Sequence, residues 1–421
     1  MKRVLDRLRN WKRRLMRVHY SHKAVQYWAV QRQNPLSIPA KKRLLIVPCD
    51  PWSVTGSRGD EAMIEATLEH FPDYEVGVVT STPEATKNVM AKGWIPLESW
   101  RGPVVLKSIV ESAEFFAPEY CAVLGADCMD GFYSPEASLI LMAIPDILRV
   151  RGVKTSLLGF SFNDHPVRKV IRGFGKVDGS FVFNLRDSAS KERFEIFTGR
   201  SARLVADVAF LLKPDFETEQ FHLVSQWKLR LGGKVLAVNL HPMLIHGASK
   251  EVIDEQINVL AQVLGQIIHD TNWNILLIPH DFRQEIGDNA CLAPLYKYLS
   301  KDYSQRICHV SDELSAAQIK GIISLADALL TSRMHLGIGA LSQGIPVISF
   351  QYQGKFQGLL KHFNLPESLI LPLPQQVHAP SLQLRLMEFL ENSDYFRQQI
   401  VGRLPEVVNL ARLNLSFKSN E

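Results

Sequence analysis

The chain has 421 residues, of which 46% are hydrophobic and 22% charged, an ordinary composition for a folded protein of two or three domains. Its five cysteines are odd in number and not closely spaced, which argues against a disulfide framework or a zinc site and indicates a reducing compartment. The net charge of +5 is uneven, because residues 1–23 carry nine Lys or Arg and one Asp (+8), while the other 39 basic and 42 acidic residues sum to −3. No stretch approaches the ~20 apolar residues of a membrane span, and no continuous apolar core follows the basic start.

Residues 1–31 predict a basic amphipathic helix. Apolar side chains recur at alternating spacings of four and three along it, at Val4, Leu8, Trp11, Leu15 and Val18. A basic helix with a tryptophan is typical of an anionic membrane surface. The sequence leaves open whether residues 1–23 contact a membrane, a partner or the protein's own body. The slightly acidic remainder and the lack of a recognised module argue against a nucleic-acid partner. Residues 32–43 read as a linker.

Residues 44–215 predict a first α/β domain. Strands are expected at 44–48, 75–79, 120–125, 155–160, 179–183 and 203–211, with helices at 62–70 and 137–150. The loop at 49–61 contains neither G-x-G-x-x-G nor a P-loop, so it supports no dinucleotide or NTP site. Asp60 and Glu61 open the first helix, where they could complement the dipole, hold sugar hydroxyls or act as a base. Arg186 ends a strand before a helix capped by Asp187 or Ser188.

Residues 213–232 read as a link to a second α/β domain over 232–375. Its strands are expected at 235–240, 273–279, 307–310, 328–331 and 346–350, and its helices at 252–268, 289–299, 315–324 and 336–342. His241 and His280 end strands, and we expect structural roles for both. Residues 380–415 are helical, and the sequence leaves open whether they pack back on the first domain. Two such domains, each a Rossmann-like parallel sheet, make a cleft between them the default site.

The stretch Ser332-Arg333-Met334-His335 lies between an apolar strand and a helix. Gly344 stops that helix before the next buried strand. The carboxyl end of a parallel strand and the amino end of a helix meet there, so backbone N–H groups and positive dipole favour an anion. Arg333 can fork onto a carboxylate or phosphate, and His335 can exchange protons near neutral pH. The alternative for each residue is a surface ion pair or a helix cap.

Four motifs resemble the polysaccharide pyruvyl transferase family, whose members have a two-domain fold similar to GT-B glycosyltransferases. The most specific runs from Ser332-Arg333-Met334-His335 through Gly344-Ile345-Pro346 to Tyr352 and Lys355. The others are Gly59-Asp60-Glu61-Ala62, Arg186-Asp187-x-x-Ser190 and Asp207-Val208-Ala209-Phe210. Ser57 departs from the family's usual Asn, and Gly125-Ala126-Asp127 replaces a more glycine-rich turn.

The resemblance implies transfer of a pyruvyl group from phosphoenolpyruvate to two hydroxyls of a sugar, giving a cyclic ketal and phosphate. Arg333 and Arg186 would hold the trianionic donor, with the backbone N–H groups near His335 and Leu336 and, more weakly, Lys355. His335 would protonate the enol carbon. Asp60 or Glu61 would take a hydroxyl proton or orient the sugar, with Asp60 as the preferred base and Glu61 as the preferred sugar ligand. We expect neither a cofactor nor a metal, because no metal-ligand spacing appears.

Two other functions compete with this prediction. A GT-B glycosyltransferase using a nucleotide sugar would usually carry a carboxylate in the second domain, but the stretch from Arg333 to Lys361 has no Asp or Glu. A non-catalytic scaffold for glycan assembly would have less reason to keep Arg333 and His335. If the leader contacts a membrane, the expected acceptor is a lipid-linked glycan at the cytoplasmic face. The expected location is therefore the cytoplasm, with peripheral contact to the inner face of the membrane left open.

Overall fold

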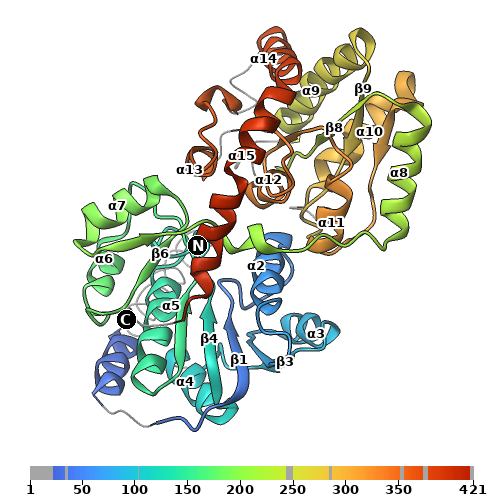
Figure 1. The fold of residues 1–421 in the computed structure, drawn as a ribbon. Helices are drawn as coiled ribbons and strands as arrows, with labels where there is room; N and C mark the ends of the chain where they lie inside the picture. The colour runs from blue at the N-terminus through green and yellow to red at the C-terminus, as the bar shows by residue number, and fades with distance from the viewer. Residues whose placement is uncertain are drawn as a thin grey trace, which may run out of the picture. The chain divides into compact units, whose positions relative to one another are not determined.

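The structure is a computed structural model (Figure 1), and it describes residues 22–33, 37–102, 104–242, 250–283, 287–350, 355–372 and 378–417. Most of the predicted basic leader, residues 1–21, therefore lies outside the described residues. Among the described helices, none combines the length and the apolar character needed to cross a bilayer.

The chain divides into two compact units that are not contiguous in sequence. Unit 1 comprises residues 1–55, 67–207 and 413–421, and unit 2 comprises residues 56–66 and 208–412. The sequence placed residues 56–66 in the first domain, whereas the structure groups them with the second. The C-terminal helices α14 (Ala379–Glu391) and α15 (Ser393–Arg412) also belong to unit 2.

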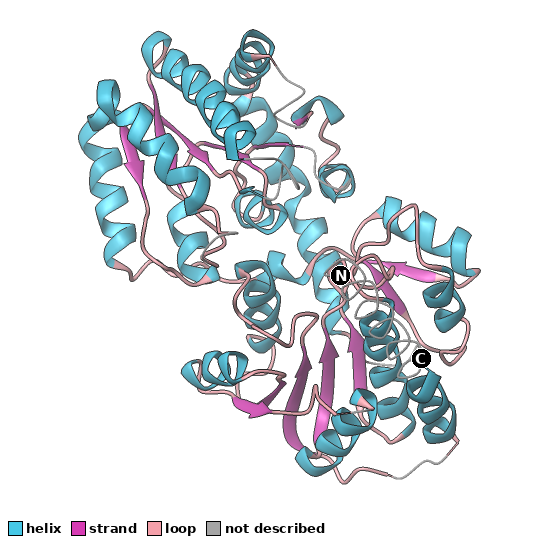
Figure 2. Ribbon diagram, turned by 180° about the vertical axis from the view of Figure 1, so that it is seen from behind, coloured by secondary structure: helices cyan, strands magenta, loops and turns pink. Residues whose placement is uncertain are grey.

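Unit 1 is built on a parallel sheet with the strand order β3-β2-β1-β4-β5. Its strands are β1 (Lys41–Val47), β2 (Glu75–Val79), β3 (Ile95–Leu97), β4 (Pro118–Val123) and β5 (Lys154–Leu157). A two-stranded parallel sheet, β6 (Phe183–Leu185) with β7 (Ala202–Leu204), is joined to the end of β5 by a bridge between Phe160 and Leu185. The helices are α3 (Pro83–Ala91), α4 (Val105–Phe116), α5 (Pro135–Val150), α6 (Arg168–Phe174) and α7 (Ser188–Thr198). Figure 2 shows the strands flanked by helices.

Residues 22–32 are helical and pack on unit 1. Trp28 is 2% exposed, and its indole N–H donates to the buried Asp146 carboxylate at 2.8 Å. Arg32 also pairs with Asp146, at 3.3 Å. The final turns of the predicted 1–31 helix therefore bind the protein's own body, and what residues 1–21 contact lies outside the described residues.

Two strands predicted in the chain's middle are partly wrong, and the expected link after them contains a helix. The strand expected at 179–183 begins only at Phe183, because Asp178 folds the chain into a turn by accepting the Ser180 N–H at 2.9 Å. The end of the strand expected at 203–211 is a 3₁₀ turn, η1 (Val208–Leu211), after the ion-paired Asp207. Much of the expected link at 213–232 is helix α8 (Glu219–Leu231), which Thr218 caps by accepting the Phe221 N–H.

Unit 2 is built on a six-stranded parallel sheet with the order β10-β9-β8-β11-β12-β13. Its strands are β8 (Lys234–Val238), β9 (Trp273–Leu277), β10 (Ile307–His309), β11 (Ala328–Thr331), β12 (Val347–Phe350) and β13 (Ile370–Leu371). Its helices include α9 (Lys250–Asp270), α10 (Asn289–Tyr303), α11 (Ala316–Ile323), α12 (Met334–Leu341) and α13 (Lys355–Lys361), with 3₁₀ turns η4 (Ser304–Arg306) and η5 (Glu367–Leu369). Every residue of β9, β11 and β12 is buried, as expected for parallel strands covered on both faces.

The order of the strands places a topological switch point between β8 and β11. From β8 the chain builds outward through β9 and β10, and it then returns to add β11 on the other side of β8. Ligands of open α/β sheets bind outside the carboxyl ends of the strands at such a point. The residues that follow β8, β9 and β11 are therefore the first place to look for a site in this unit.

Candidate active site

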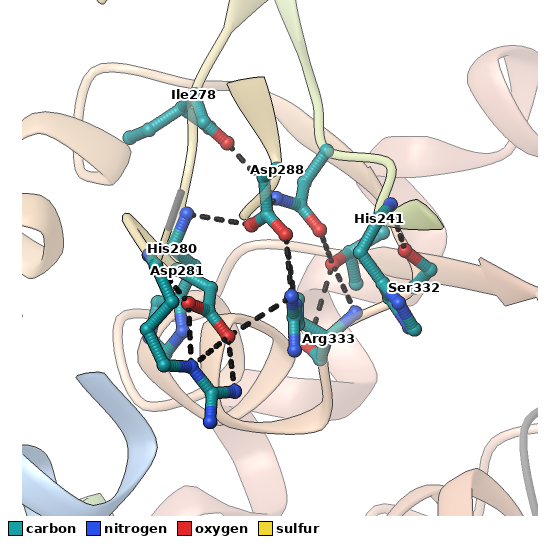
Figure 3. A network of polar contacts seen from close by, with 10 residues as sticks. His241, Ile278, His280, Asp281, Asp288, Ser332 and Arg333 are labelled. Atoms are coloured by element: carbon teal, nitrogen blue, oxygen red, sulfur yellow. Dashed lines mark hydrogen bonds and ion pairs between the residues drawn. The ribbon is translucent and has the colours of Figure 1, made fainter. Parts of the chain in front are cut away.

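Arg333 lies at the switch point of unit 2, as the N-cap residue of α12 directly after β11. Its Nε and Nη2 donate to Asp288 Oδ1 at 2.9 and 2.7 Å, and Nη2 lies 3.1 Å from Asp281 Oδ2 (Figure 3). These bonds use two of the three guanidinium nitrogens. The side chain is 17% exposed, so the guanidinium is held in place from one side without being sealed off.

Asp288 anchors this arrangement from the loop before α10. It is fully buried and accepts four hydrogen bonds: two from Arg333, one from the His280 N–H at 2.8 Å and one from the Asn239 amide at 2.7 Å. Burial raises the pKa of Asp288, while the Arg333 charge and these donors oppose the rise. Because all three partners donate to it, the ionised carboxylate fits the site. Asp288 thus orients Arg333, and no sequence motif pointed to it.

Asp281 is shared between two arginines. Its carboxylate pairs with Arg283 at 2.6 Å as well as with Arg333. The two aspartates therefore balance the two guanidinium groups, and the cluster has little net charge. An anionic ligand at this point would be selected by directed N–H groups more than by excess positive charge.

Two buried histidines, His241 after β8 and His280 after β9, lie in the same cluster. Burial and the nearby Arg333 and Lys355 charges lower the pKa of His241 to about 2. Burial, together with His335, Arg333 and Arg58, lowers the pKa of His280 well below its usual value. Both imidazoles are neutral near pH 7. The structural roles expected for them from the sequence stay a prediction.

His335 lies in the first turn of α12 and is half-buried. It packs against the segment 56–66, which belongs to the same unit. A Cβ atom added to Gly59 would lie 2.3 Å from His335 Nδ1, far inside contact distance. The absence of a side chain at Gly59 therefore allows the imidazole to occupy its position. Asp60 is half-buried, and it lies near His335 because it directly follows Gly59 in the chain.

Polar bonds fix the segment 56–66 on unit 2. Ser57 forms an antiparallel bridge with Asp281. Arg58 donates to Glu313 at 2.7 Å and lies 3.3 Å from Glu61. Glu61 is 1% exposed and accepts the Ala316 N–H at 3.2 Å. The predicted role of Glu61 in orienting the sugar is untested, and its contacts here are those of a buried residue that holds α2 (Arg58–Leu68) in place.

The other predicted site residues, Leu336, Lys355 and Arg186, do not all lie in the same unit. The Leu336 side chain is buried, and its backbone lies in the first turn of α12, where N–H groups precede the first helical bond from Gly337 to Arg333. Lys355 is the first residue of α13, and its positive charge helps to lower the pKa of His241. Arg186 belongs to unit 1, where it is 5% exposed and pairs with Asp207 at 3.0 Å. The structure therefore gathers Arg333, His335, Leu336 and Lys355 in unit 2, and it shows Arg186 with its charge already balanced.

Comparisons with known proteins bear on the family and on the fold. The family model described as "Polysaccharide pyruvyl transferase" matches residues 58–354, well over half of the chain. No curated protein matches the sequence.

Several solved structures share the fold at low sequence identity. A putative UDP-N-acetylglucosamine 2-epimerase from Listeria monocytogenes has a TM-score of 0.56 at 12% identity, covering 89% of this chain and 95% of that one. The UDP-GlcNAc 2-epimerase from Neisseria meningitidis has a TM-score of 0.54 at 9% identity, covering 89% and 99%. A glycosyltransferase from Rickettsia africae has a TM-score of 0.51 at 10% identity, covering 89% and 99%. These similarities confirm the predicted GT-B-like class of two parallel-sheet α/β domains, and they establish the fold alone.

Proposed function

The chain belongs to the polysaccharide pyruvyl transferase family, and we propose that it transfers the pyruvyl group of phosphoenolpyruvate to two hydroxyls of a sugar in a polysaccharide or lipid-linked glycan precursor. The products are a cyclic ketal and phosphate. The observation that carries this proposal is the placement of Arg333 and His335 together at the switch point of unit 2, beside the open first turn of α12.

The donor is bound by directed N–H groups. Arg333 offers the Nη1 edge that the aspartates do not use, and its orientation is set by Asp288 and Asp281. The backbone N–H groups around Leu336 and the ammonium of Lys355 supply further donors. This set suits a carboxylate and a phosphate on a three-carbon skeleton. Arg186 stays a weaker candidate, because a ligand would have to compete with Asp207 for its guanidinium.

The reaction requires one proton delivery and two C–O bond formations. In the first step a sugar hydroxyl adds to the central carbon of phosphoenolpyruvate while its methylene carbon gains a proton from His335 and becomes a methyl group. In the second step the other hydroxyl attacks the same carbon, and the bond to the phosphate oxygen breaks. One proton is taken up and two leave the hydroxyls, so the net proton departs with the phosphate. Asp60, beside Gly59, is our candidate for accepting a hydroxyl proton.

Phosphate release tests the proposal directly. Wild type should release phosphate from phosphoenolpyruvate only when an acceptor sugar from a panel is present. His335→Ala should lower the rate about 100- to 10,000-fold, the range typical of a lost general acid. His269→Ala is the matched control, because that side chain is 70% exposed on α9 of the same unit. Full activity of His335→Ala would overturn the assignment.

A nucleotide-sugar glycosyltransferase remains the competing function. Thermal-shift measurements separate the two, since the proposed function requires stabilisation by phosphoenolpyruvate and the competing one requires stabilisation by a UDP-sugar. A chain that responds to neither ligand and releases no phosphate with any acceptor would instead be a scaffold without catalytic activity.

A further inference from the structure

A cavity lies in unit 1, at the edge of its sheets opposite the strands' carboxyl ends. It has a volume of about 200 Å³ and is lined by the amino end of β5, by the residues leading into β6, and by Ser416 and Phe417 of the C-terminal tail. The tail is part of unit 1, and it directly follows α15 in the chain. None of the residues of the candidate active site lines this cavity.

Arg203 projects into this region with no acidic partner among the described residues. Its Nε donates to the Asn184 side-chain oxygen at 2.9 Å, and its Nη1 and Nη2 donate to Ser416 Oγ and the Leu413 carbonyl, both at 2.8 Å. All three acceptors are neutral. Burial lowers the pKa of Arg203, and no carboxylate offsets that effect. The guanidinium therefore keeps its full positive charge beside the cavity, and an anion can pair with it there.

The rest of the lining suits an anion. Arg149 contributes a second guanidinium, although part of its charge is balanced by Asp178 at 2.6 Å. Thr155, Ser180 and Ser416 also line the cavity, but their hydroxyls already donate to the Pro145 carbonyl, Asp178 and the Leu413 carbonyl, so the guanidinium groups supply the donors for an anion. The volume is below the roughly 300–1,000 Å³ of pockets for drug-sized ligands. It fits a phosphate group and excludes a nucleotide sugar.

We propose that this cavity is an effector site for a small phosphate-bearing anion, either inorganic phosphate or the phosphoryl group of a small metabolite. The bound anion would accept the remaining N–H bonds of Arg203 and so stabilise the C-terminal tail, whose Ser416 and Leu413 oxygens the same guanidinium binds. The planar guanidinium group of Arg203 would recognise the phosphate oxygens by paired N–H···O bonds.

Titration calorimetry at constant ionic strength tests this site, with inorganic phosphate and glycerol 3-phosphate as separate probes and chloride as the control anion. Phosphate is also the product of the proposed reaction, so the titrations use the Arg333→Ala background, in which binding at the candidate active site is weakened. We expect saturable binding with one anion per chain. The tighter of the two probes identifies the source of the phosphoryl group. Absence of saturable binding in this background would overturn the proposal and leave the proposed function unaffected.

Ser416→Asp sharpens the test, because Ser416 is exposed and its hydroxyl already accepts from Arg203. The new carboxylate would serve as an internal counter-ion, so we expect at least about tenfold weaker phosphate binding and a higher melting temperature. Ser416→Asn, of equal size and without charge, should bind phosphate as well as the parent. Hydrogen exchange should slow across residues 413–417 when phosphate binds. Equal phosphate affinity in the Asp and Asn variants would contradict the site.

Discussion

Gly59 and His335 approach each other so closely that a single added carbon atom would change the candidate active site. Because the new Cβ of Gly59→Ala would lie 2.3 Å from His335 Nδ1, either the imidazole or the helix start must move. We expect kcat for phosphate release to fall at least about tenfold, since small misplacements of reacting groups are costly. Steady-state kinetics would measure this.

Gly339→Ala is the matched control for that substitution. Gly339 lies in α12 itself, and an added Cβ would meet nothing within 4 Å. Alanine is also the better helix former, so this variant should keep full activity and gain a little stability. Equal kinetics for both variants would show that the contact at Gly59 does not position His335.

The buried imidazole of His241 makes stability depend on pH. Its pKa is about 2 in the folded protein and about 6.5 when unfolded. The unfolded state therefore binds an extra proton once the pH falls below about 6.5, and the folded state loses stability there by about 1.4 kcal/mol per pH unit. In His241→Gln, the free energy of unfolding should therefore depend less steeply on pH, by about 1.4 kcal/mol per pH unit.

Denaturant unfolding between pH 7.5 and 4.5 would measure that slope. His165→Gln provides the control, because His165 is 92% exposed. Identical slopes in wild type and His241→Gln would mean that the folded protein protonates His241 as easily as the unfolded chain does.

At the scale of the elements, the C-terminal turn η7 (Leu413–Leu415) fills the gap between β5 and the β6–β7 pair. Asn414 is fully buried there, accepts the Gly159 N–H at 2.6 Å and donates to the Ala206 carbonyl at 2.8 Å. Asn414→Ala leaves both backbone groups unsatisfied, so we expect the free energy of unfolding to drop by about 2–4 kcal/mol.

Chemical denaturation would measure this loss, with Asn409→Ala as the comparison because Asn409 is exposed on α15. That control should change stability by less than about 0.5 kcal/mol. A similar small change for Asn414→Ala would show that the turn contributes nothing to the stability of unit 1.

The elements around the site were predictable where the signal is local. The apolar run of β11, the small residues of α12 and Gly344 at a φ of +76° placed Arg333 correctly between a strand and a helix, although the helix begins at Met334 and so includes His335. The partners of Arg333 were not predictable, because Asp288 reaches it only through the pairing of β9, β8 and β11. The strand expected at 179–183 failed for a different reason, since the Asp178 turn overrides the β propensity of its aromatic residues.

At the scale of the whole molecule, the two-sheet class was predictable from the sequence, whereas the contacts of segment 56–66 were not. Segment 56–66 follows β1 directly, so sequence order assigned it to the first domain. Its side chains, however, bond to Glu313, Ala316 and Asp281 in unit 2. Contacts between residues about 250 positions apart leave no trace in the periodicity of a single sequence.

The basic leader offers a second prediction at this scale. We propose that residues 1–21 bind an anionic membrane surface and bring the enzyme to a lipid-linked acceptor, since this segment carries most of the chain's positive excess. Removing residues 1–21 spares Trp28 and its bond to Asp146. The truncated protein should lose binding to vesicles that contain an anionic lipid while keeping activity on a water-soluble acceptor. Undiminished binding to those vesicles would refute the proposed contact.

The most direct test of the central claim separates binding from chemistry at Arg333 and His335. Calorimetric titration with phosphoenolpyruvate gives Kd for each variant, and phosphate release gives kcat. We predict that Arg333→Ala weakens binding about 10- to 100-fold, as expected for a lost charge-assisted pair, and that His335→Ala binds phosphoenolpyruvate nearly as well as wild type while losing turnover. Wild-type Kd in Arg333→Ala together with wild-type kcat in His335→Ala would contradict the account.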